Sequence, residues 1–578
     1  MVRQRSAKPS FPGSNPGGAS PKARGGLRFT SGLRLSWASG PSNGLAALGG
    51  LGGCSPLHLH WSPCLSTSSR RLAASLLSLS VLGSPALAAE PSQPAAKASE
   101  ASRAEAARLT AAFLGDTPLL RDLQSLTDEV GGRATGAPAN LRAVDWALAR
   151  FKEAGVEARK EAFQMPGLWL ERSASASVRG LGVDFAPRIA AMPFSTATPK
   201  GGLTAPLLDA GKGSEKDFQA LGEKAKGAFL LVDQAELKDV DGLFREYAES
   251  AEVEQRAFAA GVAGVVYVGS RPNNLLYRHN VSVGLRNTRP MVVMERDGAL
   301  RAQRLLRAGK TLTLTAELDL QIGPAYESYN VIGEIRGSTR PDEVVVVGAH
   351  LDSWDLGTGA LDNGANVVAL IDVARQMKRL GLKPARTLRF ALWNGEEQGM
   401  YGSAGYVKAH EAELDKHVMA TSFDIGCGRI NGFFTGGRPE LPPLVDQALE
   451  PVKGLGPFTQ VDAPIVGTDN FDFMMHGVPN LVANQEPALY GPNYHARSDE
   501  LDKCDPQQLR LNTAIAGALA YGFAQMDAKL PRQSRAQVEA LVHSTDLGQQ
   551  MKSFNMYEDW ATGKRGRKGG TTAGPETR

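Results

Sequence analysis

The apolar pattern is clearest in a series of strands and helices that begins near residue 330. Val344 to Val347 are consecutive β-branched residues without polar alternation, which indicates a strand covered on both faces, as in a parallel α/β sheet. Further buried strands are expected at 388–392, 419–423 and 481–483. Helical spacing predicts one helix along 367–377 and a longer one over 507–526. The alternation predicts an α/β domain with a mixed, largely parallel central sheet flanked by helices.

The remaining segments have different patterns. From about Arg103 to Phe163 apolar residues recur at helical spacing, with Gly155 as the expected cap. Between 194 and 320, short apolar runs separated by Gly and Pro predict an inserted β-rich module. The main domain is then divided into two parts, 105–193 and 321–530. Residues 90–104 are expected to be a linker, and 531–578 a C-terminal tail that ends in a frayed basic run at 564–568.

The first 89 residues contain nine Lys or Arg and no Asp or Glu, and Gly, Ser and Pro are dense up to about residue 67. Arg70-Arg71, the apolar run 72–82 and Ala86-Leu87-Ala88 have the layout of a secretory signal peptide, expected over 68–89. The run is shorter than the roughly 20 residues of a membrane span, so no stable span is expected. Because a signal peptide normally opens its chain, residues 1–67 are expected to be a non-native or disordered extension. The mature protein is expected to be secreted or periplasmic.

The formal net charge of +4 depends on this leader, since residues 90–578 alone have a net charge of about −5. No basic surface with interleaved aromatic residues is evident, which argues against a nucleic-acid partner. Cys427 and Cys504 are the cysteines of the expected mature part. After export they can form a disulfide, or they can remain two buried thiols, and the sequence leaves both open.

Potential metal ligands follow the predicted strands, at the edge where open α/β sheets bind ligands. Zn²⁺ accepts imidazole and carboxylate ligands, and two ions can lie about 3.5–4 Å apart when one carboxylate bridges them. A single His or a Glu pair is usually a surface feature, but convergence at several strand ends favours a metal site. The candidates are His350, Asp352, Asp362, Glu396, Glu397, Asp424 and His495.

The spacing of these residues also suggests roles. Adjacent side chains on extended backbone point in opposite directions, so one of Glu396 and Glu397 can bind metal while the other acts as general base. Asp352, two residues beyond His350, is placed to accept the second N–H of that imidazole. Tyr490 or Tyr494 could donate a hydrogen bond to a tetrahedral oxyanion.

Several motifs resemble those of the co-catalytic zinc exopeptidases, which include bacterial leucyl aminopeptidases and glutamate carboxypeptidases. They are His350-x-Asp352, Ala360-Leu361-Asp362-Asn363-Gly364, Asn394-Gly395-Glu396-Glu397-Gln398-Gly399, Ser422-Phe423-Asp424 and Tyr494-His495. The resemblance covers about 105–530 and implies the zinc exopeptidase fold with a protease-associated domain over 194–320. It also implies two Zn²⁺ per chain, one held by His350 and Asp424 and the other by Glu397 and His495. Asp362 would bridge them, Glu396 would be the base, and Asp352 would orient His350.

Residues and resemblance together predict a metallo-exopeptidase that hydrolyses dipeptides or short peptides with metal-activated water. An aminopeptidase acting on longer peptides remains an alternative, and a homodimer remains open. A glutaminyl-cyclase-like acyltransferase would use the same fold, usually with one zinc. A non-catalytic, receptor-like protein would be expected to lack several of the ligands. No arginine set that would recognise an acidic terminal residue is evident, so a glutamate preference is not supported.

Overall fold

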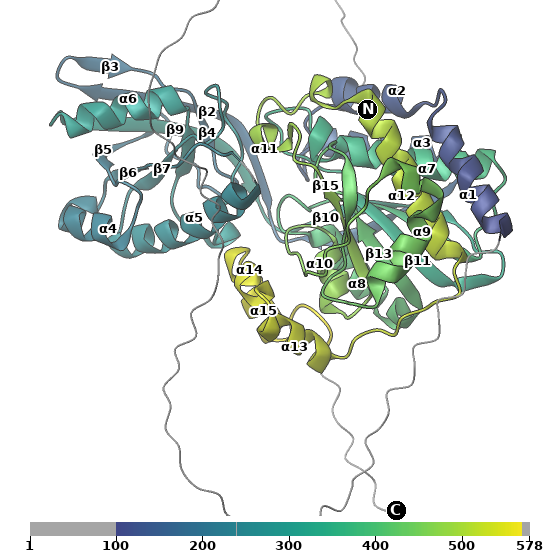
Figure 1. Ribbon diagram of the computed structural model, residues 1–578. Coiled ribbons are helices and arrows are strands. Elements are labelled where there is room, and N and C mark those ends of the chain that lie inside the picture. The colour runs from purple at the N-terminus through teal and green to yellow at the C-terminus, as the bar shows by residue number, and fades with distance from the viewer. Residues whose placement is uncertain (1–99, 239, 569–578) are drawn as a thin grey trace, which may run out of the picture. The chain divides into compact units, whose positions relative to one another are not determined.

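Two β-sheets, each with its own helices, form the computed structural model of the chain (Figure 1). Residues 100–238 and 240–568 are described, all within the compact unit Glu90–Arg578. The expected extension 1–67, the signal peptide 68–89 and residues 90–99 of the expected linker lie outside the described residues. Residues 100–104, also assigned to that linker, belong instead to helix α1 (Glu100–Phe113).

The first sheet has seven strands in the order β1-β10-β12-β11-β13-β15-β14. Its four central strands run parallel, and the outer strands are antiparallel to their neighbours. This confirms the predicted mixed, largely parallel α/β sheet. In chain order the strands are β1 (Glu157–Met165), β10 (Tyr326–Ile335), β11 (Arg340–His350), β12 (Arg386–Trp393), β13 (His417–Ser422), β14 (Ile430–Phe434) and β15 (Asn480–Gln485).

Strand β11 explains the unbroken apolar run of the sequence. Val345, Val347 and Ala349 belong to a core built with α7 (Ala365–Arg379) and α12 (Pro506–Gln525). Val344 and Val346 point to the opposite face, where they pack with residues of β12, α8 and α10. Because both faces are covered, no position is left for a polar side chain. The other helices of this domain are α2 (Leu119–Gln124), α3 (Pro138–Glu153), α8 (Tyr401–Ala409), α9 (Leu441–Leu449), α10 (Asn470–Met475) and α11 (Tyr490–Asn493).

The helical prediction for 103–163 is correct for most of its length, but residues 157–163 belong to β1. Gly155 has a positive φ of 69° after the end of α3, as expected of a helix cap. Beyond it the alternating pattern of β1 pairs antiparallel with β10. This pairing with residues far along the chain outweighs the local helical pattern.

The inserted module is an eight-stranded sheet in the order β3-β2-β9-β5-β6-β7-β8-β4, with helices α4 (Glu215–Leu221), α5 (Val240–Ala260) and α6 (Arg296–Arg307). Its first strand begins at Leu168, earlier than the predicted boundary at 194, because β2 pairs along its length with the distant β9. Strands β5 to β8 are parallel, so the description as β-rich is incomplete. The strands are β2 (Leu168–Gly180), β3 (Val183–Phe185), β4 (Ile189–Ala191), β5 (Leu203–Asp209), β6 (Phe229–Val232), β7 (Gly264–Val268), β8 (Met291–Met294) and β9 (Leu312–Gly323).

The C-terminal segment is folded against both domains, which corrects the prediction of a tail with a frayed basic end. Helices α13 (Arg535–Ser544), α14 (Leu547–Ser553) and α15 (Tyr557–Ala561), yellow in Figure 1, share a hydrophobic core with α10. The Arg565 guanidinium donates to both carboxylate oxygens of Asp472 at 2.7 and 2.6 Å. The sequence hides this partner because it lies on a different element. No helix among residues 100–238 and 240–568 is long and apolar enough to cross a membrane.

Replacing Arg565 by Ala should lower the free energy of unfolding by about 3–5 kcal/mol, because the carboxylate of Asp472 would remain buried without its partner. Urea denaturation measures the change. The matched control is Lys568→Ala, which removes an exposed cation of the same basic run and should change stability by less than about 0.5 kcal/mol. Equal stabilities of the two variants would show that the segment is frayed in solution.

Candidate metal centre

The candidate ligands gather at the carboxyl edge of the first sheet. His350 is the last residue of β11, Glu396 and Glu397 follow the end of β12, and Asp424 follows the end of β13. Parallel strands end at the same edge, so residues far apart in sequence meet there. Asp362 precedes α7, and His495 follows α11 with a positive φ of 57°.

Two groups of ligand atoms form, and Asp362 belongs to both. In the first, Nε2 of His350 lies 2.9 Å from Oδ1 of Asp424 and 3.0 Å from Oδ1 of Asp362. In the second, Nε2 of His495 lies 2.8 Å from Oε2 of Glu397 and 3.4 Å from Oδ2 of Asp362. The structure therefore brings together all five predicted metal ligands, and the two oxygens of Asp362 face different groups.

This donor set fits a pair of divalent cations. All five side chains are buried, and each group offers one imidazole nitrogen with carboxylate oxygens, the ligand types that Zn²⁺ accepts. Oε1 of Glu397 is buried without a hydrogen-bond partner among the described residues. Buried carboxylates held this close together are unfavourable unless cations lie between them. A cavity lined by Trp354, Asp362, Glu397, His495 and Asp499 adjoins the second group.

The structure corrects the predicted partner of His350. Its Nδ1–H donates to the main-chain oxygen of Asp352 at 2.9 Å, whereas the nearer carboxylate oxygen of that residue is 3.8 Å away. The Asp352 carboxylate instead accepts hydrogen bonds from the Thr135 hydroxyl at 2.7 Å and the Gly395 N–H at 3.0 Å. The main-chain oxygen of Asp352 thus fixes the tautomer of His350, with the hydrogen on Nδ1. The Asp352 side chain holds the turn that carries Glu396.

The two imidazoles have opposite proton affinities. Burial opposes the charged form of His350, but the carboxylates of Asp424 and Asp362 outweigh it and raise its pKa well above the ordinary value. Burial lowers the pKa of His495 to about 4, so this ring is neutral near pH 7. Without a metal, the protonated His350 supplies positive charge that a cation would otherwise supply.

Glu396 and Glu397 separate as the alternation of side chains predicts. Glu397 is buried among the ligands, whereas Glu396 is partly exposed. Partial burial and the carboxylates of Asp424 and Asp469 hold the pKa of Glu396 well above its ordinary value, although the charge of His350 opposes them. A carboxyl group with a high pKa that reaches solvent is suited to accept and return a proton.

Three residues that the sequence analysis did not single out hold the centre in place. The Asp499 carboxylate accepts the main-chain N–H groups of Leu361 at 2.6 Å and Asp362 at 3.1 Å. Arg133 donates to main-chain oxygens of the segment 351–359, and Thr135 contacts Asp352. Asp499 could have been suspected from its place four residues after His495. Arg133 and Thr135 could not be recognised from the sequence, because both lie in a loop far from every motif.

The two tyrosines considered as oxyanion donors differ in position. The Tyr490 hydroxyl donates to Oδ2 of Asp362 at 3.3 Å, so it lies beside the metal ligands. The Tyr494 ring stacks on His495 with 3.7 Å between ring centroids, and its hydroxyl lies 3.4 Å from that of Tyr247 in α5 of the inserted module. Tyr490 is therefore the better placed of the two.

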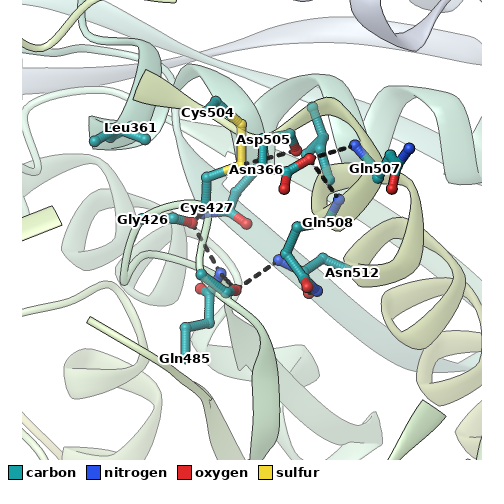
Figure 2. Close-up of a disulfide and its surroundings, with 12 residues drawn as sticks. Leu361, Asn366, Gly426, Cys427, Gln485, Cys504, Asp505, Gln507, Gln508 and Asn512 are labelled. Carbon is teal, nitrogen blue, oxygen red and sulfur yellow. Dashed lines mark hydrogen bonds between the residues drawn. A yellow bond between two sulfur atoms is a disulfide. The ribbon is translucent and has the colours of Figure 1, made fainter. Parts of the chain in front are cut away.

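Cys427 and Cys504 form a disulfide, which resolves the open choice between a bridge and two thiols (Figure 2). The bridge joins the loop after Asp424 to the start of α12. Side-chain amides of Gln485 and Asn366 donate to the Gly426 main-chain oxygen at 2.8 and 3.1 Å, as Figure 2 shows for the same loop. The segment that carries Asp424 is thus fixed covalently and by hydrogen bonds.

Zinc uptake should release protons, because the metal must displace the proton that His350 binds in its absence. Apparent affinity should fall by about tenfold per pH unit for each proton released as the pH decreases through neutrality. Calorimetric titration at pH 7 in buffers with different ionisation enthalpies measures the number of protons released on zinc binding. His495 should contribute no proton, since its pKa is about 4. Binding heats that do not depend on the buffer would contradict this prediction.

Comparison with known proteins identifies similar chains. Residues 330–520 match the family described as Peptidase family M28. Carboxypeptidase Q of Mus musculus is 29% identical over 416 residues, which cover 70% of this chain and 86% of that protein. The probable lipoprotein aminopeptidase LpqL of Mycobacterium tuberculosis is 26% identical, with 72% and 85% covered. The crystal structure of a Peptidase M28 precursor from Shewanella amazonensis superposes with a TM-score of 0.66 at 28% identity, over 75% of this chain and 98% of that one.

Proposed function

We propose that this chain, an M28-family exopeptidase similar to carboxypeptidase Q, binds two zinc ions and hydrolyses dipeptides or short peptides. One observation carries the proposal. Each oxygen of Asp362 faces a different group of ligands, and each group adds one histidine and one further carboxylate. A bridging carboxylate between two such groups is the arrangement expected of a two-metal hydrolase.

His350 and Asp424 would hold one zinc, Glu397 and His495 the other, and Asp362 would bridge them. Bound zinc supplies Lewis acidity, which polarises the scissile carbonyl and lowers the pKa of a nearby water. The full ligand set argues against a receptor-like protein without a metal. The presence of a second complete group argues against a cyclase with one zinc.

Glu396 is proposed as the general base. It takes a proton from the attacking water as the new C–O bond forms, and returns it to the leaving nitrogen as the C–N bond breaks. The products are a carboxylate and an amine. Its partial exposure and its absence from both ligand groups support this role, because the base must be free to reach the attacking water. Tyr490, whose hydroxyl lies near Asp362, is the proposed donor to the tetrahedral oxyanion.

The inserted module, proposed as a protease-associated domain, would restrict the length of substrates. Segment 276–280 of the module lies against His495 and Glu397, and Tyr247 reaches Tyr494. Walls of this kind exclude long chains from a site. We also propose a secreted or periplasmic location, supported by the signal-like pattern of 68–89.

Glu396→Gln should reduce kcat by roughly 10²–10⁴-fold, the usual contribution of general base catalysis, because the amide cannot accept the proton. Zinc content should stay at the parental value, since Glu396 belongs to neither ligand group. Steady-state kinetics and elemental analysis of the same sample test both statements. Near-parental activity would transfer the role of base to another residue.

Peptides of about two to four residues should be cleaved much faster than longer chains or folded proteins, because the module narrows the approach to the site. A peptide series with free, N-blocked and C-blocked termini, followed by mass spectrometry, identifies the end at which cleavage occurs. Rapid internal cleavage of a denatured protein would show that the enzyme is not an exopeptidase.

A further inference from the structure

The loop between β7 and β8 of the inserted module, residues 269–290, lies against the second group of ligands. We call it the docking loop. Its main chain pairs with the segment after α11 like a short antiparallel ladder, with a bridge between Tyr277 and Ala496. The Arg278 N–H donates to the His495 oxygen, and the Arg497 N–H to the Leu276 oxygen, each at 3.0 Å. The chain that carries His495 is therefore paired with the module.

The docking loop also fixes the ring of His495. Nδ1 of this histidine lies 3.2 Å from the main-chain oxygen of Arg278. A carbonyl can only accept, so the hydrogen is on Nδ1 and the lone pair on Nε2 faces Asp362 and Glu397. His495 has a left-handed backbone conformation, which a residue with a side chain keeps only when its surroundings hold it there. Both its backbone and its ring thus depend on the loop.

The same loop holds Glu397. The Asn280 side-chain amide donates to the main-chain oxygen of Glu397 at 2.7 Å. The two ligands that only the second group contains, Glu397 and His495, are therefore each bonded to residues of the module. Partners of this kind orient metal ligands, and their loss typically weakens metal binding by 10–100-fold.

A buried guanidinium anchors the docking loop to both domains. Arg278 donates to both carboxylate oxygens of Asp355, at 2.9 and 3.0 Å, in the peptidase loop after β11. On the module side it donates to Glu171 at 2.6 Å and to the Ala191 oxygen at 2.9 Å. Arg271 adds a contact of 3.1 Å to the Tyr494 oxygen. The position of the loop is thus specified by charge-assisted bonds in fixed directions.

The first group of ligands is supported differently. Nδ1 of His350 donates to the oxygen of Asp352, and Oδ1 of Asp424 accepts from the side chain of Asn363 at 3.2 Å. These partners belong to the peptidase domain, as do all the hydrogen-bond partners of this pair of side chains within the described ranges.

We propose that the docking loop is a positioning element for one zinc of the pair. The ion held by Glu397 and His495 binds tightly only when the module is docked, whereas the ion held by His350 and Asp424 needs the peptidase domain alone. The inference rests on the proposed function and assigns Arg278 and Asn280 as positioning residues. The two ions should consequently differ in their dependence on the module.

The test is a metal titration of chelator-treated full-length protein with Zn²⁺ or Co²⁺. Asn280→Ala removes the bond to Glu397 and should weaken one of two sites by 10–100-fold while the other changes by less than about threefold. The control is Gln303→Ala. Gln303 is a buried amide of the module in α6, outside the docking loop, and it donates to the Asp209 carboxylate at 3.3 Å within the module. This variant should bind both ions as the parent does.

Pairing each variant with the loss of one ligand identifies the site. In a His350→Ala background, which leaves the Glu397 and His495 site, Asn280→Ala should weaken the remaining binding by the same 10–100-fold. In a His495→Ala background it should have no further effect. Equal weakening of both sites by Asn280→Ala, or the same loss in Gln303→Ala, would overturn the inference. A parent that binds fewer than two ions would overturn the proposed function as well.

Hydrogen exchange gives a second readout, independent of any substitution. Coupling between two events is reciprocal, so zinc should strengthen docking as docking strengthens zinc binding. Saturation with zinc should slow exchange of the Arg278 and Arg497 amides, which cross between the domains. Amides inside the module, such as those of β6, should be unaffected. Unchanged exchange at the crossing amides would contradict the proposal.

Discussion

Three carboxylates and two imidazoles are buried within a few Å of one another, and the excess negative charge of this cluster is the constraint on which the site depends. Carboxylates removed from water are costly unless positive charge compensates them. The Arg133 guanidinium, whose N–H groups bind main-chain oxygens, adds one positive charge that acts on Asp362 and Glu397. The protonated His350 can balance only part of the charge. Divalent cations would supply the remaining balance, which makes metal binding and the shape of the site interdependent.

Rigidity of this centre comes from main-chain contacts contributed by distant segments. Asp499 holds the backbone of Asp362, the Asp352 side chain holds the turn before Glu396, and the disulfide holds the loop after Asp424. Each of these contacts acts on the backbone near a ligand or near Glu396 rather than on a ligand atom. The two groups of ligands differ in their supporting residues. His350 has its main-chain partner in the peptidase domain, whereas His495 and Glu397 are bonded to residues of the inserted module.

The features of the fold and of the site that could be predicted from the sequence are those that depend on residues close together in the chain. The apolar run at 344–347 predicts a strand buried on two faces, and the polar residues just beyond several strands predict where they converge. The misassigned parts depend on partners distant in sequence. The helical pattern extends into residues 157–163 of β1 because the strand that pairs with β1, β10, lies beyond the module. The sequence predicts a frayed end at Arg565 because its partner Asp472 is on another element. His350 donates to the main-chain oxygen of Asp352 and not to its carboxylate. This choice depends on the backbone geometry, which cannot be read from the identity of the residue.

The way the module is inserted has a consequence for how the chain can fold. Met165 of β1 lies opposite Tyr326 of β10, and Leu168 of β2 lies opposite Gly323 of β9. One antiparallel ribbon therefore runs from the module into the peptidase sheet, and the whole module occupies the place of the turn in a hairpin. Until the module has folded, joining β1 to β10 means closing a very long loop, with the entropy cost that this entails. Once it has folded, the two strands emerge side by side and the effective loop is only a few residues long. A module that folds first would therefore shorten the loop that this edge of the sheet has to close, and synthesis from the N-terminus completes the module before β10 is made.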